Sequence, residues 1–339
     1  MAKFKNHPTA TLELENSQAN ESFTETAKKI LIEFMNFRRV PRFNELCSGA
    51  YCFVCSSFHL PKITSAIKRN EPITFVLPAF PGKSPNTRKV LGPLPDYAEQ
   101  LSLNFLANLC NRIKDYYLPG IKIVICSDGR VFSDVIGLEE SNVTAYQIEL
   151  SRLIEKKALK DISTFNLDDF YKKLSFAEMR AKLMKGYGSS LDTLKQKVLN
   201  GEKSSASPDE QEANRMYKGM TRFLFEDSMY PEQLKSRSAI QKESRLKAYE
   251  VIIRSNAWSK LIEECFPEAV RLSIHPQTCG SKKLGIRLVG NESWITPWHG
   301  VAVKTKGGYK LLKRSEAEAL GAELVYSVEG KPSHFIIRD

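Results

Sequence analysis

Apolar residues along the chain form short continuous runs that alternate with longer segments of helical spacing. The runs at residues 73–77 and 121–126 are rich in β-branched residues and are bounded by turn residues, so each predicts a buried strand. Between them, apolar residues recur at steps of four within residues 97–117, which predicts an amphipathic helix. Strand, helix and strand in this order predict a βαβ unit and therefore a parallel sheet covered by helices.

The rest of the chain places helices in the middle and further strands near the end. Residues 23–36 have one apolar helical face, whereas residues 1–22 lack periodicity and predict a mobile tail. Residues 144–265 are mainly helical in pattern and allow a helical subdomain within a single unit of residues 23–339. Clusters of β-forming residues predict strands at residues 270–274, 284–289 and 300–304. The predicted class is α/β, with a mostly parallel sheet, a helical middle section and additional C-terminal strands.

The composition fits a folded protein of a reducing compartment. Of the 339 residues 42% are hydrophobic, but the longest apolar runs hold only about 6–8 residues where a membrane span needs roughly 20. Residues 1–20 are polar and lack the apolar centre of a secretory signal. Seven cysteines, an odd number spread thinly, do not resemble a disulfide framework. We therefore expect a cytoplasmic protein without a membrane segment.

The formal net charge of +11 favours anionic partners. Lysines are scattered among glutamates and aspartates in helical segments and form no compact basic stripe, so we expect anionic small molecules and no nucleic acid. A nucleic-acid binder stays an alternative, and its sign would be a steep loss of polynucleotide affinity with added salt.

The first candidate site follows the strand at 73–77 and comprises Lys83, Ser84, Asn86 and Arg88. Lysine and arginine supply positive charge, serine and asparagine supply neutral donors, and the prolines of this loop restrict its backbone, so the loop suits an anion. The alternative is a proline-stiffened surface turn with solvated charges. The loop is not a P-loop, because the pattern G-x-x-x-x-G-K-[ST] is absent.

A second candidate loop, residues 127–132, follows the other strand and contains Asp128 and Arg130. The carboxylate suits an ammonium group, and the guanidinium suits a phosphate or carboxylate. The alternative is an Asp-Gly turn in which Asp128 accepts a backbone N–H and Arg130 pairs with a neighbouring acid. Because the carboxyl ends of neighbouring parallel strands meet at one edge of a sheet, we expect the two loops to share a pocket.

Two of the five histidines, His275 and His299, stand at the ends of strand-like runs. An imidazole there can act as a general acid or base near neutral pH, although a histidine hydrogen-bonded within a sheet is the alternative. Neither histidine has a partner at metal-ligand spacing. Cys47, Cys52 and Cys55 form only a loose cluster without a matching second half, so we expect no metal site.

Three arginines and one tryptophan complete the candidate set. Arg152, Arg180 and Arg254 are candidate substrate contacts, although a helical arginine is usually solvated or salt-bridged. Trp298 is a candidate wall of an aromatic pocket, with plain core packing as the alternative. The dinucleotide fingerprint G-x-G-x-x-G is absent, so a Rossmann-like sheet here does not require NAD.

Five motifs together resemble the pyoverdine and dityrosine biosynthesis family, the isonitrile synthases, and they occur in the same order. They are Phe80-Pro-Gly-Lys-Ser-Pro-Asn86, Leu94-Pro-Asp96, Ser127-Asp-Gly-Arg-Val-Phe132, Ser273-Ile-His-Pro276 and Thr296-Pro-Trp-His299. Each motif alone is weak, but the combination is specific and extends from about Phe23 to about Pro332. Gly82 departs from the bulkier residue that more often precedes the lysine in this family, and we expect a wider pocket from it.

The resemblance implies a modified Rossmann-like fold and a reaction without cofactor or metal. In the family's chemistry the amine of L-tyrosine or L-tryptophan attacks the C2 ketone of ribulose 5-phosphate, and that carbon becomes the isonitrile carbon. The roles implied are phosphosugar binding by Lys83, Ser84 and Asn86, orientation and proton movement by Asp128 and Arg130, and acid/base catalysis by His275 and His299. The pathway partner is expected to be an Fe(II)/2-oxoglutarate oxygenase that acts on the product.

Several alternatives stay open. Lys83 is an acid/base or Schiff-base candidate if burial lowers its pKa. A related enzyme would form an N-formyl amino acid, as the fungal dityrosine branch of the family suggests. A non-catalytic phosphometabolite-binding protein would use the same anion loop without turnover. Nothing in the sequence decides between tyrosine and tryptophan.

Overall fold

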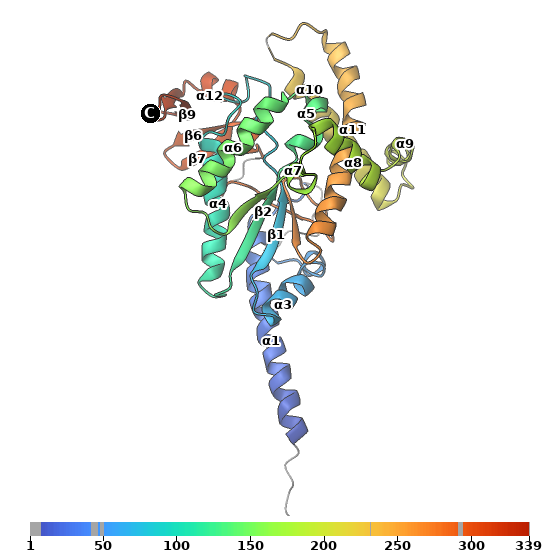
Figure 1. Cartoon of the computed structure of the whole chain (residues 1–339), viewed down its shortest axis with the longest axis vertical. Coiled ribbons are helices and arrows are strands. Elements are labelled where there is room, and N and C mark those ends of the chain that lie inside the picture. Colours follow the sequence, from blue (N-terminus) through green and yellow to red (C-terminus); the bar gives the residue numbers. More distant parts are fainter. Residues whose placement is uncertain (1–7, 42–46, 48–50, 231, 291–293, 339) are drawn as a thin grey trace, which may run out of the picture.

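The computed structural model describes residues 8–338 except 42–46, 48–50, 231 and 291–293, and its centre is a sheet of parallel strands in the order β3-β2-β1-β4-β5 (Figure 1). The strands are β1 Ile73–Pro78, β2 Ile121–Cys126, β3 Ile162–Phe165, β4 Val270–Ser273 and β5 Leu284–Gly285. Every pairing in this sheet is parallel. The predicted α/β class is therefore confirmed.

The chain order of the strands reverses at β1. From β1 the chain adds β2 and then β3 on one side, and after a long helical section it returns to place β4 on the other side of β1. Connections that leave β1 and β4 therefore diverge, and open α/β sheets bind ligands in the crevice at such a point. The loop after β1 carries the first candidate motif, and the loop after β4 carries His275.

Helices cover both faces of this sheet. The helices of the described chain are α1 Pro8–Met35, α2 Phe53–Ser56, α3 Leu60–Lys68, α4 Tyr97–Lys114, α5 Gly129–Ile136, α6 Glu140–Lys156, α7 Leu167–Phe170, α8 Phe176–Tyr187, α9 Leu191–Asn200, α10 Pro208–Ser228, α11 Arg237–Cys265 and α12 Arg314–Ala319. Figure 1 shows α4 and α11 on opposite sides of the strands. Within the described ranges, no helix is both long and apolar enough to cross a membrane.

Burial on both faces explains the continuous apolar run of β1. Phe75 and Leu77 belong to the core that includes residues of α1, α4 and α6, whereas Val76 belongs to the core with residues of α5, α8 and α11. A strand that is covered on both faces has no solvent side and therefore no polar alternation. The α/β layering follows directly from this pattern.

A smaller sheet, ordered β7-β6-β9-β8, forms in the C-terminal part of the chain. Its strands are β6 Val301–Thr305, β7 Gly308–Leu312, β8 Glu323–Tyr326 and β9 Pro332–Ile336. Ala302 and Leu311 of this sheet pack against Ala98 of α4, which also covers the large sheet. The short 3-10 helix η2 Pro297–His299 leads directly into β6, so His299 lies where the two sheets meet.

The N-terminal helix begins earlier than predicted. Residues 8–22 are helical and continue into the helix predicted from Phe23, so the expected tail without secondary structure is wrong from Pro8 onward. Eight of these 15 residues are alanine, leucine, glutamate or glutamine, which favour a helix without any periodic pattern. Residues 1–7 lie outside the described part of the chain, and the mobility of the tail stays a prediction.

Some strands also differ from prediction. β3 lies inside residues 144–265, which were predicted to be mainly helical, and it pairs with β2, so the front of that section belongs to the main sheet. It was missed because it is short and contains the polar Ser163 and Thr164. β5 is shorter than the predicted strand at 284–289, and β7, β8 and β9 were not predicted because polar residues interrupt them.

Candidate active site

The loops after β1 and β2 are bound to each other at the carboxyl edge of the sheet. Ser127 Oγ and Gln147 Nε2 donate to the carbonyl oxygen of Phe80 at 2.8 and 2.9 Å. Gly129 lies so close to the first loop that a Cβ atom on it would meet the Pro81 carbonyl oxygen at 1.9 Å. Phe80 has a φ of 60°, which is strained for a residue other than glycine. The two candidate loops thus form one tightly connected surface.

Lys83 lies fully buried within the first loop. Its ammonium pairs with Asp96 Oδ2 at 2.9 Å and Glu99 Oε2 at 2.8 Å, and it donates to the Pro297 carbonyl oxygen at 3.0 Å. These three acceptors match the three N–H donors of a lysine, so the ammonium is occupied within the protein. Burial acts to lower the pKa of Lys83, but the two carboxylates raise it above 10.5. The lowered pKa that a Schiff-base or acid/base role requires is therefore contradicted.

The other polar side chains of this loop also bind within the protein. Ser84 Oγ donates to Asp227 Oδ1 at 3.0 Å, and Asn86 Nδ2 donates to two backbone carbonyl oxygens at the end of α10, at 3.0 and 3.1 Å. Arg88 is exposed. Ser84 and Asn86 therefore attach the loop to α10, and these bonds give no support to the predicted contact with a phosphosugar, which stays a prediction.

His299 and Asp227 form a carboxylate–imidazole pair. Nε2 of His299 lies 3.4 Å from Asp227 Oδ2, and its Nδ1 lies 2.8 Å from Thr296 Oγ1. Burial acts to raise the pKa of Asp227, but His299 and Lys89 lower it to about 2, so the carboxylate stays charged. The imidazole is partly exposed. An oriented and accessible ring of this kind is equipped for acid/base chemistry.

His275 follows β4, on the other side of β1 from the second loop. Its side chain is exposed to solvent, while desolvation by the surrounding protein and the charges of Arg39 and Lys283 lower its pKa below 6.5. His299 contributes to the same shift, so the two histidines lie within electrostatic range of each other. His275 is thus a neutral imidazole near neutral pH.

Asp128 precedes α5 at the end of the β2 connection. Burial raises the pKa of its carboxyl group from 3.8 to about 7, and its Oδ1 has no hydrogen-bond partner among the described residues. Its side chain does not cap α5, which was the structural alternative for this residue. A carboxyl group that titrates near neutral pH and has one unoccupied oxygen is suited to exchange a proton with a ligand.

Three of the predicted arginines hold this region in place. Arg130 Nε donates to Asp168 Oδ1 at 2.9 Å, and Arg180 Nε donates to the Arg130 carbonyl oxygen at 2.9 Å. Arg254 donates to Asp134 Oδ1 of α5 at 2.8 Å. These contacts fix α5 behind Asp128, and the predicted contact of the three arginines with substrate stays a prediction.

Two further candidates do not join the polar groups. Arg152 is 63% exposed and pairs with Glu149 on the same helix, as a solvated helical arginine does. Trp298 is fully buried, and its ring centroid lies 5.2 Å from that of Phe80. Arg152 is therefore a surface residue of α6, and Trp298 supports the first loop from the core.

Asp227 and Glu99 were not predicted from the sequence. The spacing of Asp96 and Glu99 is that of a capping box at the start of a helix, and the two residues form one. This spacing does not indicate the ion pair of Glu99 with Lys83. Burial raises the pKa of Glu99 to about 7 against the attraction of Lys83. Asp227 stands in the last turn of α10 among other polar residues, and its partners come from distant loops. Only the tertiary structure identifies it.

Known proteins share this sequence and this fold. The pyoverdine/dityrosine biosynthesis protein family matches residues 63–325. The chain is 45% identical to the L-tryptophan isonitrile synthase AmbI2 of Fischerella ambigua over 310 residues, 91% of each chain, and 42% identical to the L-tyrosine isonitrile synthase of Xenorhabdus nematophila over 318 residues, 92% of each. The crystal structure of PvcA from Pseudomonas aeruginosa matches with a TM-score of 0.85 and 40% identity, over 92% of this chain and 100% of PvcA. Since both the family match and these relatives extend over most of its length, the chain belongs to the pyoverdine/dityrosine biosynthesis protein family.

Proposed function

We propose that this protein is an isonitrile synthase that condenses the amine of L-tryptophan or L-tyrosine with the C2 ketone of ribulose 5-phosphate. The observation that carries the proposal is the placement of Asp128 after β2 and of His275 after β4, the two neighbours of β1, with His299 close enough to His275 to affect its pKa. Relatives that act on tryptophan and on tyrosine are similar to the chain to nearly the same degree. L-tryptophan and L-tyrosine are therefore both candidate substrates, and the experiment below compares turnover of the two.

The three groups fit the proton movements that the condensation needs. The amino group attacks only as the free amine, and Asp128, with a pKa of about 7, is suited to accept the proton of the substrate ammonium. Loss of water from the resulting carbinolamine needs a proton donor, and His299, which Asp227 orients, is suited to this step. The neutral His275 is suited to remove a proton from the sugar carbon during enolisation.

Substrate anions have a source of attraction on the same side of the sheet. Arg39 and Lys283 lie close enough to His275 to lower its pKa, so their positive field also reaches the carboxylate or phosphate of a bound substrate. Lys83, Ser84 and Asn86 act in this proposal through the shape of the loop, because their polar atoms bind within the protein. An Fe(II)/2-oxoglutarate oxygenase is the proposed consumer of the isonitrile product.

The test is incubation of the purified protein with ribulose 5-phosphate and each of the two amino acids, followed by mass spectrometry for the isonitrile acid. We expect product with at least one amino acid. The variant His299→Gln should lower kcat about 10²- to 10⁴-fold, which is the usual contribution of a positioned acid or base. Arg152→Ala, on the exposed surface of α6, serves as the matched control and should retain activity.

Other products would select the alternatives. An N-formyl amino acid in place of the isonitrile would identify the formylating branch of the family. Binding of ribulose 5-phosphate without turnover, unchanged in His299→Gln, would identify a phosphometabolite-binding protein and overturn the proposal.

A further inference from the structure

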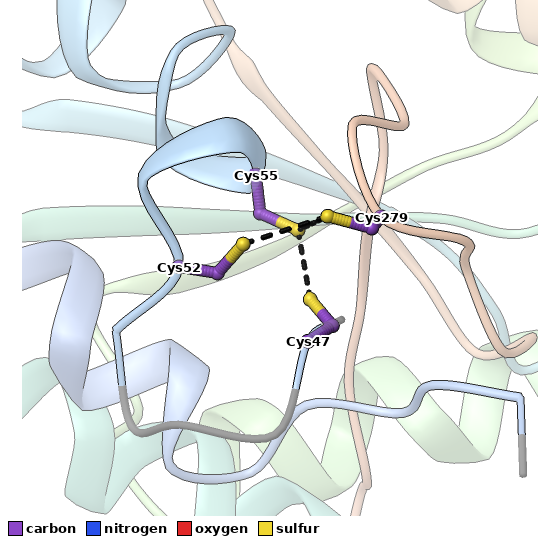
Figure 2. Close-up of side chains that lie close together, drawn as sticks. All are labelled: Cys47, Cys52, Cys55 and Cys279. Atoms are coloured by element: carbon purple, nitrogen blue, oxygen red, sulfur yellow. Dashed lines mark hydrogen bonds between the residues drawn. The ribbon is translucent and has the colours of Figure 1, made fainter. Parts of the chain in front are cut away.

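Four cysteines that have no part in the proposed reaction converge at one point. Cys47, Cys52 and Cys55 come from the segment between α1 and α3, and Cys279 comes from the connection between β4 and β5 (Figure 2). Their sulfur atoms all lie within 4.8 Å of one another. No metal site was predicted, because Cys47, Cys52 and Cys55 have no matching second half in the sequence. In the folded chain Cys279 completes a group of four thiols, so the reason for that prediction is wrong.

The sulfur distances match the first coordination sphere of a single ion. Cys47 and Cys55 lie 3.1 Å apart, Cys52 and Cys279 lie 3.5 Å apart, and Cys55 and Cys279 lie 3.6 Å apart. A tetrahedral zinc ion with Zn–S bonds of about 2.3 Å holds its sulfurs about 3.8 Å apart. The four thiols therefore need only small side-chain adjustments to bind one ion.

The local backbone presents the sulfurs toward a common centre. Cys52 is the residue before α2 and Cys55 lies within it, so a spacing of three residues places both on one side of a helical turn. Cys-x-x-Cys is also the usual spacing of a pair of zinc ligands. Gly280, directly after Cys279, has a φ of 78° and turns the chain at that ligand. Figure 2 shows the four sulfurs pointing inward from these two segments.

Positive charge surrounds the cluster. Arg38 donates from one guanidinium nitrogen to Cys47 Sγ at 3.2 Å and from another to the Cys47 carbonyl oxygen. Arg38 and Lys283 also line a small pocket that Cys55 borders. Four thiolates around a divalent ion carry a net charge of about −2, and such a centre is stabilised by cationic neighbours that donate to its sulfurs. Four neutral thiols carry no net charge, so cationic neighbours would not stabilise them in this way.

We propose that Cys47, Cys52, Cys55 and Cys279 bind one Zn²⁺ ion as a closed structural site. Binding releases the four thiol protons and forms four Zn–S bonds, with no change of oxidation state. Since all four coordination positions are filled by cysteine, the ion has no open position for a substrate. The site is separate from the proposed isonitrile chemistry, which needs no metal.

The ion would join two segments that are far apart in the sequence. Backbone hydrogen bonds already connect them, from Arg39 N to the Gly285 carbonyl oxygen at 2.8 Å and from Gln277 N to the Arg39 carbonyl oxygen at 3.0 Å. The β4–β5 connection that carries Cys279 also carries His275. Zinc therefore fixes the segment between α1 and α3 against the β4–β5 connection, which carries the proposed catalytic residue His275.

The first test is the metal content of the full-length protein, purified without chelators and measured by inductively coupled plasma mass spectrometry. We expect about one zinc per chain, following the stoichiometry of a four-cysteine site. Cys52→Ser and Cys279→Ser should each lose most of this zinc. Cys265→Ser is the matched control, because Cys265 is a free cysteine at the end of α11, outside the cluster, and it should keep the full content.

A measurement on the unmodified protein covers the case in which the serine variants do not fold. A mercurial thiol reagent should release the zinc, and reconstitution with Co²⁺ should give the visible absorption of a tetrahedral cobalt thiolate centre. Removal of the ion should lower Tm, and readdition should restore it.

Three results would overturn the proposal. They are a zinc content near zero with all seven thiols titratable, the loss of four thiols as disulfides in protein kept under reducing conditions, and iron in place of zinc. None of these results depends on turnover. The zinc proposal can therefore be disproved while the isonitrile synthase proposal stands, and the isonitrile synthase proposal can be disproved while the zinc proposal stands.

Discussion

Lys83 is fully buried in the loop after β1, so its positive charge must be balanced inside the protein. Its ammonium lies between the buried carboxylates of Asp96 and Glu99. Removing one partner of a buried ion pair leaves an uncompensated charge and typically costs about 3–5 kcal/mol. We therefore expect Lys83→Ala to lower the free energy of unfolding by about that amount in urea titrations. Arg152→Ala, which breaks an exposed pair, should change it by less than about 0.5 kcal/mol, and an equal effect of the two variants would contradict a buried ion triad.

Asp128 should make stability depend on pH in a direction that is unusual for an aspartate. Its pKa rises from 3.8 to about 7 on folding, so the folded protein binds more protons than the unfolded chain between these values. The free energy of unfolding therefore decreases as pH rises from about 4 to about 7. In Asp128→Asn the pH dependence that comes from residue 128 is absent. The pH dependence from Glu99, whose pKa is also raised to about 7, remains in both proteins. The stability of the variant relative to the wild type should thus increase across this range, measured by urea unfolding at several pH values, and a constant difference would disprove the raised pKa.

At the scale of elements, the contact between the β1 and β2 connections depends on Gly129. A Cβ at this position would lie 1.9 Å from the Pro81 carbonyl oxygen, so Gly129→Ala must move one of the two loops. We expect lower thermal stability and loss of most isonitrile synthase activity. Gly219→Ala is the control, because Gly219 lies inside α10 with open space around it, and alanine there should add about 0.5–1 kcal/mol of stability. Retained activity in Gly129→Ala would show that the loops are not rigidly connected.

The elements that the sequence predicts well are those whose buried residues form a regular pattern, either a continuous apolar run or one apolar helical face. β2 has the predicted bounds, and β1 and α4 begin where predicted, because long apolar runs or continuous helical spacing mark them. β3 and the strands β7, β8 and β9 of the small sheet were missed, since short strands with polar residues give little pattern.

The same limit holds for the site. Strand-end loops could be identified from the sequence, because topology alone brings the ends of parallel strands together. The partners of each side chain could not, because Asp227 reaches His299 and Ser84 only in the folded chain, and Cys279 reaches Cys55 only there. The residue types of the loops indicate acid/base and anion-binding chemistry. Which of these side chains stay free to contact a ligand depends on contacts between residues that are distant in the sequence.

At the scale of the whole molecule, the two sheets are joined by shared parts. α4 packs against both, and η2 holds His299 against Asp227 of α10. We expect a single cooperative unfolding transition, with calorimetric and van't Hoff enthalpies in agreement by differential scanning calorimetry. Two separate transitions would show that the C-terminal sheet unfolds independently.

The position of β1 at the centre of the large sheet has a consequence for the protein during its synthesis. β2 can pair with β1 soon after it leaves the ribosome, whereas β4 follows only after α11 has been translated. Until then one edge of an apolar strand lacks its neighbour, and an open edge is a template for pairing with another chain. Nascent chains that stall between β2 and β4 are thus the species most prone to aggregate and the ones on which chaperones should act.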